Sequence, residues 1–171
     1  MGKLIANEFM SMDGVAQAPS YPDEDADGAF GHGGWHTPFL DEVSMTRLIE
    51  NVTSAGRYLL GRRTYQIFAA HWPHAAGEEQ ALAQPLNERP KYIASTTLSE
   101  PLDWQNSRLL QGDVADSVKA LKTNQQGDIH LIGSPMLART LLEQNLIDEL
   151  RLMIDPILLG AGKRIFPDSD A

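Results

Sequence analysis

The sequence Arg-Tyr-Leu-Leu-Gly-Arg-Arg-Thr-Tyr, residues 57–65, decides the fold that we predict for this chain. Residues 58–60 form an apolar run that predicts a short buried strand, and Gly61 ends it. Residues 62–64 then begin a helix, whose first turn carries unpaired N–H groups and partial positive charge. Two guanidinium groups and a hydroxyl add donors suited to a phosphate. A solvated basic helix end has the same pattern, so both interpretations stay open here.

A second junction of this kind lies further along the chain. Residues 128–132 predict a strand, Gly133-Ser134 follows it, and Pro135 occupies the first position of a helix. Glycine lets a backbone N–H approach a pyrophosphate, although a plain strand-to-helix turn has the same sequence. Together the two junctions match one bent dinucleotide, with the pyrophosphate at Gly133-Ser134 and the adenosine-side phosphate at residues 62–64. Residues 95–96 follow a neighbouring strand and add hydroxyl groups there, or form an ordinary polar loop.

The remaining chain alternates strands with helices. This order predicts an α/β fold with a largely parallel sheet, helices on both faces and the glycine junctions at one sheet edge. A first helix is expected to begin at Thr37-Pro38, and residues 19–35 form an irregular loop over the pocket. The predicted strands are residues 3–11, 58–60, 91–95, 107–110, 128–132 and 149–159, and the other predicted helices are 62–68, 78–86, one capped by Asp113, and 135–145.

Composition narrows the class of protein. The 171 residues suit one domain, residues 1–171, and the absence of cysteine excludes disulfides and cysteine-based sites. A net charge of −9 argues against a nucleic-acid partner. The start of the chain does not resemble a signal peptide, and no apolar stretch approaches transmembrane length. We therefore expect a cytoplasmic protein without a membrane partner, and the spacing of the histidines and acidic residues predicts no metal site.

Several segments resemble the dihydrofolate reductase-like superfamily, in the branch of the C-terminal reductase domain of riboflavin biosynthesis and its stand-alone relatives. The resemblance covers nearly the whole chain in order and implies a three-layer α/β/α fold. The matching segments are Ser-Met-Asp-Gly at 11–14, Leu-Gly-Arg-Arg-Thr-Tyr at 60–65, Lys-Tyr-Ile-Ala-Ser at 91–95, Ile-His-Leu-Ile-Gly-Ser at 129–134, and the tail from 147–150 to 159–162.

The resemblance also implies site residues. Members of the superfamily bind NADPH and deliver hydride to a pteridine or pyrimidine ring. Asp13 is implied beside the nicotinamide, as a candidate proton donor. The helix start at Thr37-Pro38 puts Trp35 just before it and Asp41 one turn inside it, so we expect both to reach one ligand that has Gly133 at its far end. Asp41 is then a catalytic, substrate-binding carboxylate, or it only complements the helix dipole, and Tyr65 is also expected at the substrate. The residues implied to bind NADPH are Gly61, Arg62, Arg63, Thr64, Ser95, Thr96, Gly133 and Ser134.

Three features depart from the family pattern. The carboxylate expected after Trp35-His36-Thr37-Pro38 comes one residue late, at Asp41, which places it roughly 100° around a helix. Residues 66–73 lack the Asp-Pro stretch with which the riboflavin reductases bind a ribose-phosphate. The chain also ends soon after residues 160–166, where relatives continue with closing strands. An open sheet edge invites pairing, so we expect a homodimer.

We therefore expect an NADPH-dependent reductase acting on a small pteridine- or pyrimidine-like substrate. Two alternatives stay open. One is the 5-amino-6-(5-phosphoribosylamino)uracil reductase of riboflavin biosynthesis, and the other is a non-catalytic, nucleotide-binding homodimer.

Overall fold

The computed structural model describes residues 2–124 and 127–166. Its centre is one six-stranded sheet with the order β4-β3-β2-β5-β1-β6, in which every strand pair is parallel. This confirms the predicted α/β class. The strands are β1 (Leu4–Ser11), β2 (Arg57–Gly61), β3 (Lys91–Ala94), β4 (Ser107–Leu109), β5 (Ile129–Ile132) and β6 (Glu149–Asp155).

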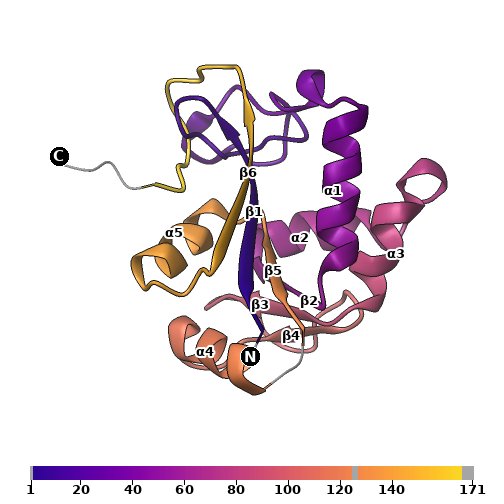
Figure 1. Cartoon of the computed structure of the whole chain (residues 1–171), viewed down its shortest axis with the longest axis vertical. Helices are drawn as coiled ribbons and strands as arrows, with labels where there is room; N and C mark the ends of the chain where they lie inside the picture. Colours follow the sequence, from indigo (N-terminus) through magenta and orange to yellow (C-terminus); the bar gives the residue numbers. More distant parts are fainter. Residues whose placement is uncertain (1, 125–126, 167–171) are drawn as a thin grey trace.

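Helices cover both faces of the sheet, which gives the three predicted layers (Figure 1). One face carries α1 (Glu42–Ser54), α2 (Arg62–His71) and α3 (Gln80–Glu88), and the other carries α4 (Val114–Asn124) and α5 (Pro135–Glu143). Three short 3-10 helices lie in the connections: η1 (Asp27–Ala29), η2 (Thr37–Phe39) and η3 (Gly77–Glu79). Within the described part of the chain, no helix is long and apolar enough to span a membrane.

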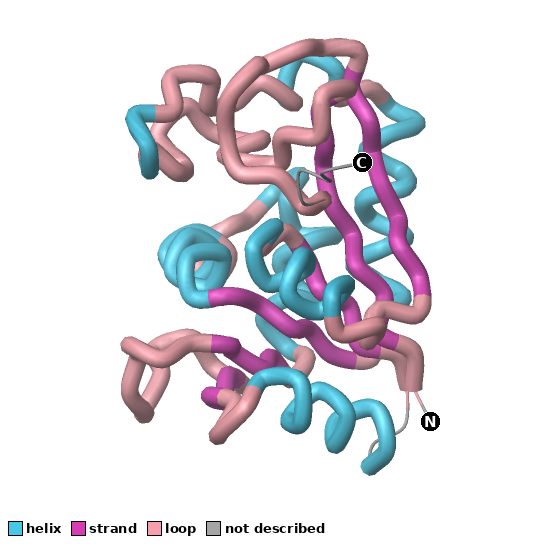
Figure 2. Tube along the Cα trace, turned by 90° about the vertical axis from the view of Figure 1, so that its left-hand side faces the viewer, coloured by secondary structure: helices cyan, strands magenta, loops and turns pink. Residues whose placement is uncertain are grey.

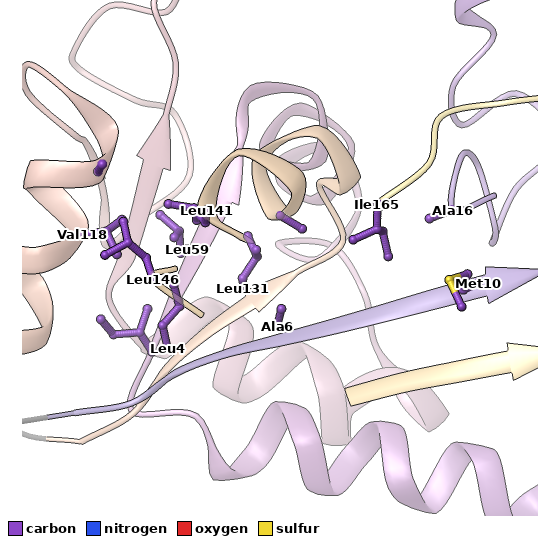
Figure 3. Packing of buried hydrophobic residues seen from close by; sticks show 13 residues of the cluster. Leu4, Ala6, Met10, Ala16, Leu59, Val118, Leu131, Leu141, Leu146 and Ile165 are labelled. Carbon is purple, nitrogen blue, oxygen red and sulfur yellow. The ribbon is translucent and has the colours of Figure 1, made fainter. Parts of the chain in front are cut away.

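Successive side chains of β2 point to opposite faces of the sheet, so this strand contacts both helix layers. Leu59 packs into the cluster under α4 and α5, whereas Tyr58 and Leu60 pack into the cluster under α1 and α3. All three side chains are fully buried, as the apolar run at 58–60 predicts. Figure 3 shows Leu59 beside Leu131 and Leu141, from β2, β5 and α5. The two helix layers therefore pack against opposite faces of the same central strands.

The strands differ in how far they extend. The last residue pair between β1 and β5 is Asn7 with Ile132, whereas β1 continues beside β6 as far as Ser11. Beyond Asn7 the side of β1 that faces β5 is therefore open, at the carboxyl edge of the sheet. The loops gather at this upper end of the molecule in Figure 2.

The loop after β1 is fastened to the segment after β6. Val15 and Arg164 form an antiparallel bridge, and the Lys163 N–H donates to Gln17 Oε1 at 3.0 Å. Figure 1 shows these two segments side by side at the top of the view. Within the long irregular stretch predicted at residues 19–35, Asp25 and Asp27 bond Lys163 at 2.6 and 2.8 Å, so this stretch is an ordered cover over the end of the sheet.

The first helix begins later than the sequence predicts. Thr37 and Pro38 lie in η2, a single 3-10 turn, and α1 starts only at Glu42. Asp41 caps α1 by accepting a hydrogen bond from the Ser44 N–H at 2.8 Å. The predicted start at Thr37-Pro38 is therefore wrong, because Leu40 adopts an extended conformation that ends the 3-10 turn.

Candidate functional site

A cavity of about 980 Å³ lies at the carboxyl edge of the sheet. Its walls are the ends of β1, β5 and β6, the first turns of α2 and α5, one face of α1, and the loop that follows β1. Parallel sheets bind ligands at this edge, between two neighbouring strands whose following connections run in opposite directions. Here those strands are β2, whose connection leads to β3, and β5, whose connection leads to β6.

One end of the cavity, here called the glycine end, consists of residues 61–64 and 133–134. All six residues line the cavity. Ser134 Oγ accepts from the Gly61 N–H at 2.9 Å and donates to Thr64 Oγ1 at 2.7 Å, which ties the two junctions together. Gly133 has a φ of 56°, where glycine is favoured, and Ser134 adopts the same left-handed region at 66°. The first turns of α2 and α5 therefore face one space, and their N–H groups suit an anion there.

The two adjacent arginines at this end have different surroundings. Arg62 is exposed, donates to the neutral amide of Gln66 at 3.1 Å, and forms no ion pair with any carboxylate of the described chain. Arg63 is paired with Asp27 at 2.6 Å and with Asp25 at 3.3 Å, and Lys163 bonds the same two carboxylates. Arg62 thus has donors available for a ligand, whereas Arg63 fastens the covering loop to α2.

A second cavity, of about 570 Å³, is also lined by Arg62. Ser95 and Thr96 line it together with Arg62, as the predicted phosphate site requires. The Ser95 hydroxyl accepts from the backbone N–H of Leu98 at 3.0 Å and of Thr97 at 3.2 Å, so the turn holds its oxygen in place. The hydroxyls at 95–96 and the guanidinium of Arg62 therefore border one space, beside the glycine end.

The opposite end of the main cavity, here called the histidine end, is formed by Phe9, His36 and Asp155. His36 Nδ1 lies 2.6 Å from Asp155 Oδ2, and both side chains are buried. The imidazole stacks on Phe9, with ring centroids 3.9 Å apart and an interplanar angle of 19°. All three residues line the cavity. Each comes from a different segment, namely β1, the loop before η2, and the end of β6.

Three buried polar atoms that have no hydrogen-bond partner belong to residues lining this cavity: Asn7 Oδ1, Glu8 Oε1 and His36 Nε2. Glu8 is 5% exposed, and burial raises the pKa of its carboxyl well above the ordinary value. A fold usually pairs such atoms, because an unpaired buried polar group destabilises the native state. Their concentration at one cavity points to a ligand site.

The structure places three predicted site residues outside the cavity. Asp13 accepts from the backbone N–H groups of Leu159 and Gly160 at 3.0 and 2.7 Å, so it fastens a turn. Asp41 is exposed and caps α1. Trp35 packs with Val15 and Leu159, and its indole N–H donates to the Gln17 carbonyl. None of the three lines the cavity that Gly133 lines, which corrects the expectation that Trp35 and Asp41 reach one ligand with Gly133 at its far end, and that Asp13 lies beside the nicotinamide.

Tyr65 also lies away from the cavity. It is 5% exposed, packs in the cluster under α1 and α3, and its hydroxyl accepts from the Trp104 N–H at 3.2 Å. Its predicted contact with substrate is corrected likewise, because its side chain forms part of the core beside α3. In the part of the chain that the structure describes, no three His, Cys, Asp or Glu side chains are arranged to hold a metal ion.

The sequence interpretation missed the histidine end and Glu8. His36 and Asp155 are 119 residues apart, and neither belongs to a motif that signals a pair. Glu8 offered one signal, because an acidic residue stands inside the core strand Leu4–Ser11, whose other polar residues, Asn7 and Ser11, are uncharged. A charged residue at a buried strand position is a candidate functional residue from sequence alone.

The family described as RibD C-terminal domain matches residues 2–171. The uncharacterized protein YyaP of Bacillus subtilis strain 168 is 32% identical over 112 residues, which cover 64% of this chain and 58% of that relative. The matched part is thus less than two thirds of the relative's length.

Two solved structures share the fold. A putative riboflavin biosynthesis protein from Shewanella sp. PV-4 matches with a TM-score of 0.70 and 19% identity, over 99% of this chain and 85% of that one. Dihydrofolate reductase from Enterococcus faecalis, complexed with NADP(H) and RAB-propyl, matches with a TM-score of 0.60 and 15% identity, over 99% and 79%. These matches confirm the predicted dihydrofolate reductase-like fold.

Proposed function

This chain belongs to the RibD C-terminal domain family, and from that premise we propose that it is an NADPH-dependent reductase of a small pteridine- or pyrimidine-like substrate. The observation that carries the proposal is the glycine end, where the first turns of α2 and α5 line one cavity beside Arg62. Reductase domains of this family use NADPH, which has a pyrophosphate and a 2′-phosphate to be held. The proposal gives each of these anions a group of donors.

The pyrophosphate is assigned to the first turns of α2 and α5. Gly133 has no side chain to obstruct the approach of a ligand, and Thr64 keeps a hydroxyl hydrogen to donate after accepting from Ser134. Both helices exceed two turns, so their N-terminal N–H groups carry an aligned dipole. Both contributions favour a negative charge at this point of the cavity.

The 2′-phosphate is assigned to Arg62, with Ser95 and Thr96 opposite it in the second cavity. Because the Arg62 guanidinium has no carboxylate partner in the described chain, it forms charge-assisted hydrogen bonds to a phosphate without breaking an ion pair within the protein. Arg63 is a weaker candidate, because a phosphate would compete there with Asp25 and Asp27. The assignment therefore predicts that NADPH binds more tightly than NADH.

When bound, the dihydronicotinamide supplies the hydride, and the chain supplies position and enclosure. The main cavity continues from the glycine end to the histidine end, where it is lined by Phe9 and by Asn7 and His36, each of which has a buried polar atom without a hydrogen-bond partner in the described chain. Aromatic stacking and a few directed polar groups suit a flat heterocycle. The loop that bears Asp25 and Asp27 covers this space and is fastened by Arg63 and Lys163.

A spectrophotometric assay tests the function. NADPH is incubated with the protein and with a panel of oxidised pteridines and pyrimidines, and its oxidation is followed by absorbance. We expect at least one compound to be reduced, with little turnover of NADH. Tight NADPH binding without turnover of any compound would instead favour the non-catalytic, nucleotide-binding alternative.

Family membership also favours a second candidate, the 5-amino-6-(5-phosphoribosylamino)uracil reductase of riboflavin biosynthesis. A phosphoribosyl substrate needs a second anion site at the substrate end, and Arg47 and Arg151 line the cavity near there. Arg151 is held by Glu149 at 2.6 Å and by Asn51 at 3.0 Å, which reduces its availability. The same assay with the phosphoribosyl compound and with its base alone separates the two candidates, because only the pathway enzyme requires the phosphate.

We also propose a homodimer that forms through β6. Among the described strands, β6 pairs with β1 alone, so its outer edge offers unpaired backbone groups. Ile154 on this strand is 55% exposed, and Leu158 after it is 73% exposed. Light scattering is expected to give twice the chain mass of 18.8 kDa, and a mass of 18.8 kDa at micromolar concentration would contradict the dimer.

A further inference from the structure

His36 is held on two sides by residues from other segments. Its Nδ1 pairs with Asp155 Oδ2 at 2.6 Å, and its ring lies flat on Phe9 at a centroid distance of 3.9 Å. Trp35 packs against it edge-on, with ring centroids 6.3 Å apart and an interplanar angle of 76°. The imidazole is 3% exposed, so its position and orientation are fixed by packing.

The second ring nitrogen has no such role. His36 Nε2 is buried and has no hydrogen-bond partner among the described residues, while the residue lines the main cavity. If His36 only fastened the loop to β6, it would need Nδ1 alone, and an apolar atom at the position of Nε2 would serve equally well. His36 Nε2 therefore has a fixed orientation and no hydrogen-bond partner in the described chain, in a residue that lines a cavity. A ligand that forms the missing hydrogen bond explains this arrangement.

We infer that His36 Nε2 forms a hydrogen bond with a heteroatom of the bound heterocycle, while Asp155 positions the ring. The inference rests on the proposed function and adds a residue to it. The carboxylate accepts from Nδ1–H and so leaves Nε2 directed away from Asp155. Phe9 keeps the imidazole plane constant.

Two asparagine variants isolate this nitrogen. His36→Asn keeps an amide N–H near the place of Nδ1, so it retains a donor for Asp155 while it removes Nε2. His71→Asn is the matched control, because His71 is paired with Glu79 at 2.9 Å and does not line the cavity. Thermal unfolding of both variants shows whether each is folded before any binding is measured.

Calorimetric titration of lumazine and of 5-aminouracil into the NADPH-loaded proteins measures the contact. We expect wild type and His71→Asn to bind at least one compound equally, and folded His36→Asn to bind it at least tenfold more weakly, with unchanged affinity for NADPH. Equal binding by His36→Asn would overturn the inference, as would failure of both compounds to bind the loaded wild type. Failure of wild type to bind NADPH would overturn the proposed function instead.

A measurement on wild type keeps the inference testable if His36→Asn does not fold. In ¹⁵N spectra of the histidine rings, the compound that binds is expected to shift Nε2 of His36 more than Nδ1. The ring of His71, which is paired with Glu79 and does not line the cavity, is expected to stay unchanged and serves as the internal control. An unmoved Nε2 signal in the bound state would show that another group contacts the heterocycle.

Discussion

The two ends of the main cavity are built in different ways. The glycine end uses two continuous stretches, residues 61–64 and 133–134, in which backbone N–H groups and the exposed Arg62 face the cavity. The histidine end uses Phe9, His36 and Asp155, which come from three segments and are buried against one another. Local backbone geometry makes the first end, whereas long-range packing makes the second.

This difference predicts how each end responds to substitution. A change at the exposed Arg62 leaves the core untouched, so it is expected to alter binding much more than stability. A change at the buried His36–Asp155 pair removes one member of a desolvated pair, so stability and binding are expected to fall together. Each substitution below tests one side of this contrast.

The largest expected effect is that of Asp155→Ala. It leaves the buried imidazole of His36 without its partner, and breaking a buried pair costs about 3 kcal/mol or more. Urea unfolding monitored by fluorescence gives the change. The control is Glu79→Ala, which removes the partner of His71 at a half-exposed site and is expected to cost less than about 1 kcal/mol. Equal losses of unfolding free energy in both variants would show that burial of the His36–Asp155 pair adds nothing to its contribution to stability.

Asp13→Ala is expected to cost about 2 kcal/mol, because the carboxylate accepts backbone N–H bonds from Leu159 and Gly160. Hydrogen bonds from the Ser11 hydroxyl and the Leu159 N–H lower the pKa of Asp13 to about 2. A lowered pKa means that this stabilisation is complete above the ordinary value of 3.8 and is lost as pH falls toward 2.

The measurement is acid unfolding of both proteins. Between pH 4 and pH 2 wild type is expected to lose more stability than Asp13→Ala, while NADPH affinity at pH 7 stays similar. A large loss of NADPH affinity in a folded Asp13→Ala protein would show that Asp13 belongs to the cofactor site.

Glu8→Gln is expected to stabilise the protein by about 1 kcal/mol at pH 8, because it removes an acid that has no partner in a buried position. Burial raises the pKa of Glu8, so the folded state holds a proton that the unfolded state releases above the ordinary value of 4.5. Stability of wild type therefore falls as pH rises from 4.5 toward the raised pKa.

Unfolding free energies of both proteins at pH 5 and pH 8 check this prediction. The difference between the two proteins is expected to grow with pH. A constant difference would mean that Glu8 is not protonated in the folded state, and that a cation outside the described contacts pairs with it.

Ser134→Ala is expected to cost about 1 kcal/mol of stability, no more than the change at Glu8 in magnitude. The Ser134 hydroxyl joins Gly61 to Thr64, so its removal leaves one backbone N–H and one hydroxyl without their partner. The two junctions should separate slightly, and NADPH affinity should fall as well. Differential scanning fluorimetry and calorimetry give both quantities, and a loss of stability without any loss of affinity would contradict the glycine end as a ligand site.

The sequence predicts the elements well where the signal is local. The run at 58–60 and Gly61 predict β2 and the start of α2 correctly, because burial, glycine and the helix start agree. The Thr37-Pro38 signal predicts a helix that the structure does not form there. Two cap signals lie within one turn of each other, and the one at Asp41, which bonds both the N–H and the hydroxyl of Ser44, begins the helix.

The candidate site shows the same difference between residues that a local sequence signal predicts and residues that only the fold brings together. Every predicted residue of the two glycine junctions lines the cavity, because each strand end and helix start is one continuous stretch. Asp41 and Trp35 were placed from their distance to a helix start, and the shift of that start moves Asp41 to solvent. No local pattern joins Phe9 to His36 or His36 to Asp155, since only the folded sheet brings them together.

The most direct test of the central claim is the affinity of the protein for NADPH and NADH in three forms: wild type, Arg62→Ala and Arg63→Ala. Calorimetry at one salt concentration is expected to show NADPH preferred by wild type. Arg62→Ala should weaken NADPH at least tenfold, equivalent to about 1.4 kcal/mol, and leave NADH unchanged. Arg63→Ala should have a smaller effect, because Asp25 and Asp27 already engage its guanidinium. Equal affinities of wild type for the two cofactors, or normal NADPH binding by Arg62→Ala, would contradict the assignment of the glycine end.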